Sequence, residues 1–405
     1  MFIAPAGHET FGLSVRPPGP YWGYFGINVA EVHKGYNNER LRFFDHYLKG
    51  IESGIDKEPP IYIYVMNGDG WRLENEWPLG RQAITNYYFA EGNTLAKDKT
   101  SNGSDNYKVD LTLKNLQSRW TNGIAALKEI VKRTDLDPKC LTYTSEPLEQ
   151  DVEVTGHPIV HFWVSSTAND GDFFVYLEDV DDKGEALFVT DGLLRANFAK
   201  LIPYDFLPPG SQMSVLPDLP WHGFKQSDYV DGIFAGGNKV ELVIDLLPTS
   251  WVFKKGHRIR VSIAGADWPT LRLHPKLSPN NKPDDPGNIV PTITVYRDAD
   301  HPSRIDLPVI PQKPILFEGT AKVRTSDGTY KGQAELYAFT DAVYLRYENQ
   351  WMKWGSCEHR EGKSLESFEC SGDFGKLRAT IRHKKDDSYV TSADGHGVSF
   401  KGTAK

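Results

Sequence analysis

The pattern of apolar and polar positions divides the chain into a short α/β segment followed by a long β-rich part. An apolar run at residues 2–4 ends at a proline and a glycine, as expected for a buried strand that turns into a loop. Apolar residues recur at helical spacing from Asn38 to Lys49, and Gly50 is suited to end that helix in a left-handed conformation. The run Ile61–Met66 is apolar on both faces, which is typical of a parallel strand covered on both sides. The first 66 residues therefore predict one strand–helix–strand crossover of an α/β sheet.

The same pattern predicts how this crossover is buried. The helix has one apolar stripe, which consists of Leu41, Phe44 and Leu48. We expect Phe43 and Phe44 to lie in the core, and we expect His46, on the opposite face, to be solvated. A single crossover does not cover both faces of its own strands, so we expect exposed apolar surface around residues 61–65.

Beyond the crossover, short alternating runs separated by turn residues predict a β-sandwich. These runs are residues 86–90, 152–154, 159–165, 173–179, 241–246 and 258–264. We expect a short helix at Ile124–Lys132 and two long loops rich in proline and glycine, at Pro203–Gly237 and Leu273–Asn288. The β pattern then resumes, and Ile315–Lys405 is predicted to be a separate small antiparallel domain without recognisable chemistry.

Composition narrows the class of protein without changing this picture. The chain has 405 residues, a net charge of -8 and 39% hydrophobic residues, which is ordinary for a globular protein. Its acidic balance argues against a nucleic-acid-binding protein. No apolar run approaches the ~18 residues of a membrane span. The chain is therefore predicted to be soluble, with the cytoplasm as the favoured compartment and any signal peptide lying upstream.

Candidate chemistry is sparse. Three cysteines do not make a disulfide framework, and Cys357 and Cys370 either pair across a hairpin or remain free thiols. The chain has no Gly-x-Ser-x-Gly elbow, no P-loop and no His-Glu-x-x-His motif, and no spacing indicates a metal site or a cofactor. His8 is the strongest candidate catalytic residue, because it lies on a loop directly after the first predicted strand. The alternative is a histidine on an ordinary surface loop.

Several segments in a fixed order carry a family resemblance. They are Ile3–His8, Arg42–Gly50, Pro59–Leu79, Leu141–Leu148, Glu153–Gly156, Asp172–Arg195 and Gly256–Val261. In this order they resemble the C-terminal part of the CocE/NonD serine hydrolases, a family that includes cocaine esterase and the Xaa-Pro dipeptidyl-peptidases. The first segment is similar to the strand end that holds the family's catalytic histidine, although Ala6 and Gly7 depart from the usual residues before it. The resemblance covers residues 1–312.

This resemblance implies a mostly β fold in three parts. Residues 1–84 would be the C-terminal remnant of an α/β-hydrolase domain, comprising its last strand, helix and strand. Residues 85–312 would form a jelly-roll β-sandwich like the Xaa-Pro dipeptidyl-peptidase C-terminal domain, and residues 313–405 a small antiparallel β domain of unknown role. Within the sandwich we expect a structural role for His257 and hydrogen-bonding roles for Asp172 and Asp179.

The resemblance also implies a Ser-His-Asp mechanism on ester or amide bonds, either acyl or Xaa-Pro dipeptidyl, without a cofactor or a metal. Only His8 carries over, because the family's serine and aspartate precede that histidine and would precede Met1 here. The chain is thus predicted to be a fragment or subunit of a hydrolase. Its implied partners are a small ester, amide or peptide substrate and an upstream catalytic half, with a homo-oligomer left open and no nucleic acid or membrane. The alternative is a non-catalytic β-sandwich module for binding or assembly.

Overall fold

The computed structural model describes residues 2–3, 40–99 apart from 54, 58–59, 69 and 75, residues 102–115, 132–203 and 219–311, and the strands between 315 and 404. The chain divides into two compact units. The first consists of Met1–Pro5, Ile27–Arg81 and Pro311–Lys405, and the second of Ala6–Gly26 and Gln82–Ile310. The unit limits at residues 81 and 310 lie close to the boundaries expected at 84 and 312. The division into three domains stays a prediction.

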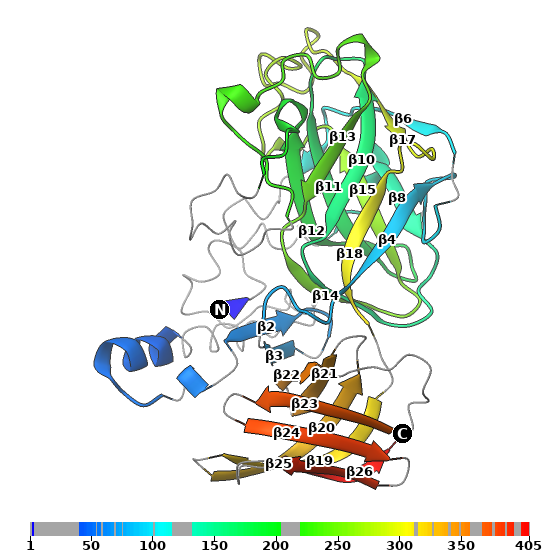
Figure 1. Ribbon diagram of the computed structural model, residues 1–405. Helices are drawn as coiled ribbons and strands as arrows, with labels where there is room; N and C mark the ends of the chain where they lie inside the picture. Colours follow the sequence, from blue (N-terminus) through cyan, green and yellow to red (C-terminus); the bar gives the residue numbers. More distant parts are fainter. Residues whose placement is uncertain are drawn as a thin grey trace. The chain divides into compact units, whose positions relative to one another are not determined.

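The first unit contains the predicted crossover (Figure 1). Strand β1 (Phe2–Ile3) pairs in parallel with β2 (Ile61–Val65). A helix at residues 40–49 and a 3-10 turn, η2 (Ile55–Lys57), lie between these strands in the sequence. Strand β3 (Gly70–Glu74) follows and pairs antiparallel with β2. The parallel pairing across an intervening helix confirms the α/β crossover.

The helix ends as its sequence predicts. Gly50 has a φ of 68°, and its N–H bonds to the carbonyl of His46 at 3.1 Å. The N–H of Ile51 also bonds to the carbonyl of Asp45, at 2.9 Å. The bond from Gly50 to His46 is the 5→1 bond of an αL motif. His46, predicted to be solvated, is half-buried, and its ring centroid lies 4.7 Å from that of Tyr47.

Burial in this unit differs from the prediction in two respects. Phe43 and Phe44 are 48% and 45% exposed, so the expectation that they lie in a core is wrong. Ile63 and Val65 are 0% and 1% exposed, so the expectation of exposed surface on that strand is also wrong. Strand β2 pairs with β1 and β3, and its side chains on both faces are covered, whereas the helix presents its apolar stripe to solvent.

The second unit is the predicted β-sandwich. Its main strands are β4 (Ala83–Ala90), β5 (Thr94–Ala96), β6 (Ser104–Lys108), β8 (Leu141–Ser145), β9 (Val152–Gly156), β10 (Ile159–Ser166), β11 (Asp172–Val180), β12 (Ala186–Arg195), β13 (Val240–Asp245), β14 (Thr249–Phe253), β15 (Arg258–Ala264), β17 (Thr292–Tyr296) and β18 (Arg304–Ile310). They follow the order β12-β11-β15-β8-β5-β4-β18-β10-β17-β6, with β13 beside β10, and with β9 beside β18 and β14. A small parallel pair joins β7 (Lys114–Asn115) to β16 (Trp268–Pro269).

Aromatic contacts show that this sheet folds over into two layers. Phe162 of β10 and Phe173 of β11 lie 5.6 Å apart between ring centroids, although their strands are far apart in the strand order. Phe89 and Tyr143 stack at 4.2 Å, and all four rings are buried. The core therefore lies between the two layers, as in other β-sandwiches.

The loops of this unit agree with the prediction where they are described. We expected a helix at residues 124–132, but residues 116–131 lie outside the described part of the chain. Of the expected helix only Lys132 is described, and it forms a β-bridge with Leu187. Residues 273–288 form turns without a helix or strand, as expected. The remaining short elements are 3-10 turns, namely η4 (Asp137–Lys139), η5 (Ala196–Phe198), η8 (Gln226–Asp228) and η9 (Ala235–Gly237).

The C-terminal part of the first unit is antiparallel, as predicted. Its strands are β19 (Ile315–Thr325), β20 (Gly328–Ala338), β21 (Ala342–Tyr347), β22 (Gln350–Ser356), β23 (Ser367–Phe374), β24 (Leu377–Lys384), β25 (Asp387–Ser392) and β26 (Val398–Ala404). Strand β22 also meets β3 in parallel at one register pair, Gln350 with Leu73. Whether Cys357 and Cys370 pair or remain free thiols stays open, because Cys357 lies outside the described residues.

Gly192 offers a test of the packing between β12 and β13. A Cβ at this position would lie 2.6 Å from the backbone oxygen of Asp245 and 2.9 Å from Cγ2 of Ile244. We expect Gly192→Ala to lower the free energy of unfolding by about 1–3 kcal/mol, measured by urea titration. Gly171→Ala is the matched control, because its Cβ would meet only the Phe173 ring, at 3.6 Å. Equal stabilities of the two variants would contradict this packing.

His157, in the turn between β9 and β10, offers a test of pH dependence. Burial lowers the pKa of His157 to about 4, below its ordinary value near 6.5. Between these values the unfolded chain binds a proton that the folded chain does not bind, so the free energy of unfolding falls as the pH is lowered. We expect His157→Gln to remove about 1–2 kcal/mol of the stability loss between pH 7 and pH 5. Urea titrations at both pH values check this, and an unchanged difference would refute it.

Candidate functional site

The place of the predicted catalytic histidine is indicated by β1. His8 follows Ile3, the last residue of β1, by five positions. Because β1 and β2 are parallel, the loop after β1 leaves the sheet at its carboxyl edge, where α/β proteins commonly place their sites. His8 itself lies outside the described residues, so its catalytic role stays a prediction.

A buried carboxylate between two arginines braces the strand next to β2. Arg81 donates two hydrogen bonds to the carboxylate of Glu74 on β3, from Nη1 to Oε2 at 2.6 Å and from Nη2 to Oε1. Nε of Arg72 lies 2.7 Å from Oε1 of the same carboxylate. The Arg81 and Glu74 side chains are 1% and 2% exposed. Two arginines on one buried carboxylate satisfy its charge and fix the end of β3 to the segment that leaves it. This cluster therefore fixes β3, the strand that pairs with β2.

The second unit contains a histidine–aspartate pair that resembles half of a catalytic triad. Nδ1 of His257 lies 2.8 Å from Oδ1 of Asp179, and Nε1 of Trp251 donates to Oδ2 at 2.9 Å. Asp179 is completely buried, and this burial raises its pKa even though both hydrogen bonds oppose the effect. In the part of the chain that the structure describes, the His257 ring bonds to no serine, threonine or cysteine. The pair is structural, as the sequence predicted for both residues.

Asp172 also has the hydrogen-bonding role expected of it. Its two carboxylate oxygens accept from Nε and Nη2 of Arg195 at 2.7 Å and 3.1 Å. The two residues are register partners on β11 and β12. This bidentate bond raises the pKa of Arg195 and closes the open end of the hairpin.

One buried charge cluster was not predicted. Nε of Arg133 lies 2.6 Å from Oε1 of Glu178, and its guanidinium carbon stands 3.5 Å from the ring centroid of Tyr176. The Tyr176 hydroxyl donates to Asp267 at 2.6 Å. Burial and the nearby Asp137 act to raise the pKa of Glu178, while Arg133 opposes this rise by stabilising the carboxylate. The cluster fixes the segment before β8 onto β11.

The sequence did contain a signal for this cluster. Glu178 and Asp179 are adjacent and directly follow the run Phe173–Leu177, so they project from opposite faces of a strand that is buried on both sides. Buried carboxylates require partners, and the partners here come from distant segments. Among the described residues, no three histidine, cysteine, aspartate or glutamate side chains are placed to hold a metal ion.

The segment that forms the β-sandwich identifies the protein family of this chain. A family model described as the X-Pro dipeptidyl-peptidase C-terminal non-catalytic domain matches residues 53–306. This chain belongs to that family. It corresponds to the C-terminal portion of a CocE/NonD-type hydrolase, as the order of its motifs predicted.

Similar proteins place this family among hydrolases. A Mycobacterium bovis protein provisionally named a serine esterase is 39% identical over 315 residues, which are 74% of this chain and 47% of that protein. Cocaine esterase of Rhodococcus sp. is 29% identical over 305 residues, covering 71% of this chain and 48% of that enzyme. The structure of an aminopeptidase from a marine Thaumarchaeota archaeon shares the fold, with a TM-score of 0.56 at 20% identity, covering 76% of this chain and 49% of that chain. The chain spans about half the length of the curated relatives it matches.

One further observation concerns membranes. Among the residues that the structure describes, no helix is long and apolar enough to cross a bilayer.

The pair of Arg133 and Glu178 offers a test of the buried cluster. We expect Arg133→Met to lower the free energy of unfolding by about 3–5 kcal/mol, because it leaves the Glu178 carboxylate buried without its counter-charge. The double variant Arg133→Met with Glu178→Leu should recover most of this loss, since both charges are then removed.

The neighbouring residue supplies the control. Lys132 pairs with Glu185 at the surface, where their side chains are 47% and 41% exposed, and Lys132→Met should cost less than about 1 kcal/mol. Urea titrations of the four proteins measure these effects. If Lys132→Met and Arg133→Met lower the free energy of unfolding by similar amounts, burial does not make the pair of Arg133 and Glu178 more important for stability than a surface pair.

Proposed function

We propose that this chain contributes the histidine and the accessory sandwich of a serine hydrolase that cleaves ester or amide bonds. His8 acts as the general base, and the nucleophilic serine and the orienting aspartate come from a segment encoded upstream or from a separate chain. Acyl esters and Xaa-Pro dipeptidyl amides are the substrate classes. The observation that supports the proposal best is the parallel pairing of β1 with β2 in a chain 39% identical to a protein provisionally named a serine esterase.

In the proposed chemistry, His8 takes up one proton and gives it back in each half of the reaction. In the first half, His8 takes the proton of the serine hydroxyl as its oxygen attacks the carbonyl carbon, and returns it to the leaving alcohol or amine. In the second half, His8 takes a proton from water as the water oxygen attacks the acyl carbon. His8 then returns this proton to the serine oxygen as the bond to the acyl group breaks, which releases the acid and restores the serine. A histidine alone forms no acyl-enzyme, so the chain requires the serine for this activity.

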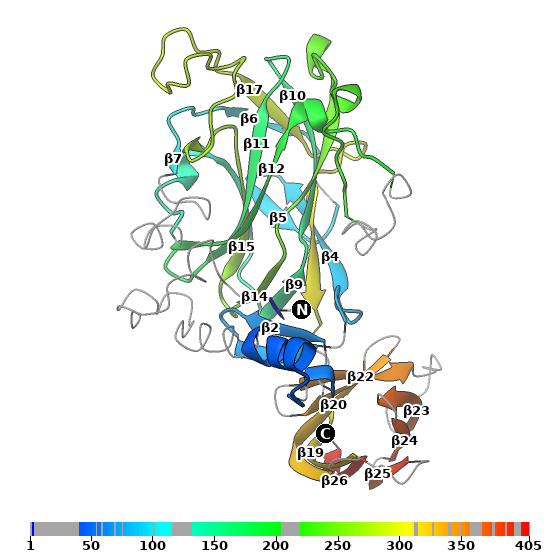
Figure 2. The same ribbon diagram turned by 90° about the vertical axis from the view of Figure 1, so that its left-hand side faces the viewer.

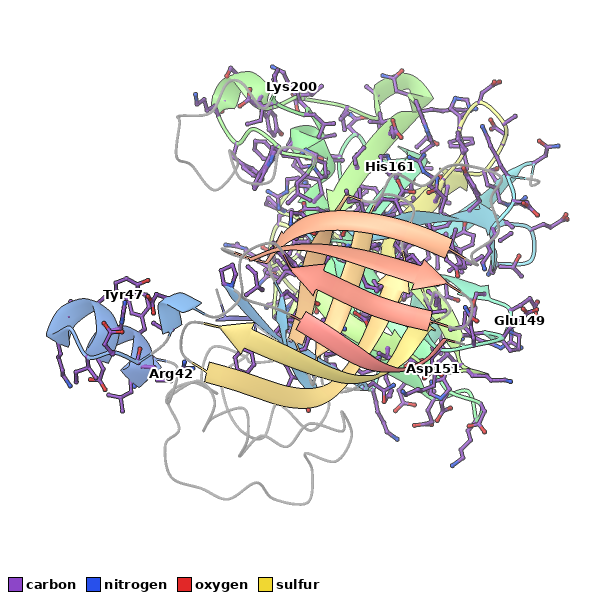
Figure 3. All side chains as sticks on the ribbon, turned by 60° about the horizontal axis from the view of Figure 1, so that its bottom comes forward. Arg42, Tyr47, Glu149, Asp151, His161 and Lys200 are labelled. Carbon is purple, nitrogen blue, oxygen red and sulfur yellow. The ribbon has the colours of Figure 1, made fainter. Side chains whose placement is uncertain are left out.

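The apolar face of the helix at residues 40–49 supports the same proposal. Leu41, Phe44 and Leu48 are 57%, 45% and 75% exposed, and Arg42 and Tyr47 mark this helix in Figure 3. Helices in α/β domains bury such a stripe against the parallel sheet or against a neighbouring helix. The upstream part of a catalytic domain would provide that cover.

A non-catalytic binding or assembly module is the second candidate. The description of the matched family as a non-catalytic domain favours it. The two candidates differ in one respect that an experiment addresses: only the hydrolase requires His8.

Complementation tests the role of His8. The purified chain is assayed with p-nitrophenyl butyrate and with Ala-Pro-p-nitroanilide, alone and mixed with the N-terminal half of the Mycobacterium bovis relative. We expect activity only in the mixture, and we expect His8→Ala to reduce it by at least about a thousandfold, as for the loss of a triad member. His301→Ala, in a sandwich turn, is the control and should retain it.

Two outcomes would contradict the proposal. The first is equal activity of the His8→Ala and wild-type mixtures. The second is an unrelated gene directly upstream of the Met1 codon, together with a wild-type chain that copurifies with no serine-bearing partner. If the mixture is inactive but the DNA upstream of Met1 encodes a serine-bearing segment, the assay is repeated with that segment in place of the half from Mycobacterium bovis.

A further inference from the structure

The chain contains three Asn-Gly dipeptides, at residues 67–68, 102–103 and 122–123. In such a dipeptide the backbone nitrogen of the glycine can attack the side-chain carbonyl of the asparagine, because glycine has no Cβ to hinder the approach. This attack releases ammonia and changes the asparagine permanently. The third dipeptide lies outside the described residues, whereas the structure shows different surroundings for the first two.

The dipeptide at residues 102–103 lies directly before β6, which is the edge strand next to β17 (Figure 2). Asn102 and Gly103 are both exposed. In the described ranges, neither the carboxamide of Asn102 nor the N–H of Gly103 has a hydrogen-bond partner. The φ of Gly103 is 105°, a conformation that residues with a Cβ rarely adopt. The two groups that react are therefore accessible and without competing hydrogen bonds.

A buried arginine holds the main chain of this dipeptide. Nη1 of Arg297 donates to the carbonyl of Asn102, and the backbone N–H of Arg297 donates to the carbonyl of Gly103 at 3.0 Å. Nε of Arg297 donates to Oδ2 of Asp105 at 2.9 Å, and the Tyr143 hydroxyl donates to the same oxygen at 2.9 Å. The Arg297 side chain is 8% exposed. Its guanidinium is therefore fixed, with its charge on the carbonyl of the Asn102–Gly103 peptide bond.

An arginine on this carbonyl favours attack by the nitrogen of the same peptide group. When the Gly103 nitrogen gives up its proton, the negative charge is shared with the carbonyl oxygen of Asn102. A charge-assisted hydrogen bond to that oxygen stabilises this charge as it develops. Arg297 therefore lowers the free energy of forming the nucleophile, and it is in place before the reaction starts.

We propose that Asn102 is a site of spontaneous modification at which Arg297 promotes the formation of isoaspartate. In the first step, the Gly103 nitrogen loses its proton to water and bonds to Cγ of Asn102. The side-chain amide then takes up a proton and leaves as ammonia, so that a cyclic imide remains. The reaction needs only the protein and water, and it is independent of the hydrolase activity proposed above.

Water then opens the imide at one of its two carbonyl carbons. Either attack breaks the bond from that carbon to the Gly103 nitrogen, which regains a proton. Attack at Cγ gives aspartate, whereas attack at the main-chain carbon of residue 102 gives isoaspartate. The second carbon carries the oxygen that Arg297 binds. The guanidinium polarises this carbonyl for attack and pairs with the carboxylate that forms there, so it favours isoaspartate over aspartate.

The dipeptide at residues 67–68 provides an internal comparison. It lies in the short turn between β2 and β3, whose pairing extends to Val65 with Gly70. Asn67 has a φ of 54° and takes part in an interaction within the fold. The two paired strands fix this turn from both ends, and closure of the imide ring would require the turn to distort. We therefore expect Asn67 to react more slowly than Asn102 in the folded chain.

Peptide mass spectrometry of the full chain, incubated at mildly alkaline pH, tests the proposal. We expect Asn102 to react at least about tenfold faster than Asn67, which is the effect of one charge-assisted hydrogen bond on a rate. The rate should rise with pH, because the attacking nitrogen has lost its proton. In concentrated urea the two sites should react at rates within about twofold of each other, since the fold no longer distinguishes them.

Two variants test the role of the arginine. Arg297→Gln keeps a hydrogen-bond donor but removes the charge, and it should slow the reaction at Asn102 by about tenfold. Arg304→Gln is the matched control, because it makes the same change at an arginine that binds Asp306 on β18, and it should leave the rate within about twofold. Circular dichroism establishes that both variants fold.

A measurement on the wild-type chain keeps the test decisive if Arg297→Gln fails to fold. The ratio of isoaspartate to aspartate at residue 102 should be higher in the folded chain than in urea, and an equal ratio would overturn the role of Arg297. The proposal is also overturned if Asn102 reacts no faster than Asn67 in the folded chain, or if a folded Arg297→Gln variant reacts as fast as Arg304→Gln.

Discussion

Main-chain hydrogen bonding along strand edges is the constraint on which this structure depends. A strand edge that is neither paired nor covered leaves N–H and C=O groups available to other chains, and folded proteins keep such edges short. In the sandwich, β18 pairs with β4, β9 and β10, so one strand joins both layers by backbone bonds. In the first unit, β2 is paired on both sides, and β26 returns to β19. Pairing on both sides therefore fixes the places of β18 and β2 within their sheets.

Charged side chains inside this framework connect segments that the backbone does not. Glu178 and Asp179 lie side by side on β11 and project from opposite faces, so they engage different partners. Glu178 reaches Arg133 in the segment before β8, whereas Asp179 reaches His257 and the Trp251 indole. A buried carboxylate is tolerated only where such partners satisfy it, and removal of one partner costs more than the pair contributes. These pairs therefore specify which loops pack against β11 more than they add to its stability.

The sequence predicted the elements of this fold better than their surroundings. Periodicity identifies a strand because alternate side chains face opposite ways, and six sandwich strands, β4, β9, β10, β11, β13 and β15, were predicted in this way. Strands such as β12 and β18 were not among the predicted runs. Burial depends on which surface comes to lie against an element, and no local pattern contains that information. The apolar helix stripe was therefore placed in a core, although Phe44 is 45% exposed. The pair of Arg133 and Glu178 was missed for the same reason, because 45 positions separate its members.

The candidate site was predictable to a different extent. His8 was identified by its place after an apolar strand and by a resemblance between motifs, and the parallel pairing of β1 confirms the strand that precedes it. The geometry of a triad depends on residues from several segments, and the resemblance places the other two before Met1. The sandwich pair of His257 and Asp179 shows why residue types alone are insufficient. It has a histidine on an aspartate at 2.8 Å, yet its surroundings make it a packing element.

Two features of the first unit have a common explanation under the proposed function. Strand β1 lies at the end of its sheet order, with β2 as its partner among the described strands. The helix that follows β1 in the sequence exposes Leu48 and its neighbours on the stripe. A further parallel strand beside β1, with its own helix beside residues 40–49, would cover both surfaces at once. A binding module built from the sandwich provides no such strand and leaves the crossover without a role, so the α/β crossover is the part of this chain that favours the hydrolase.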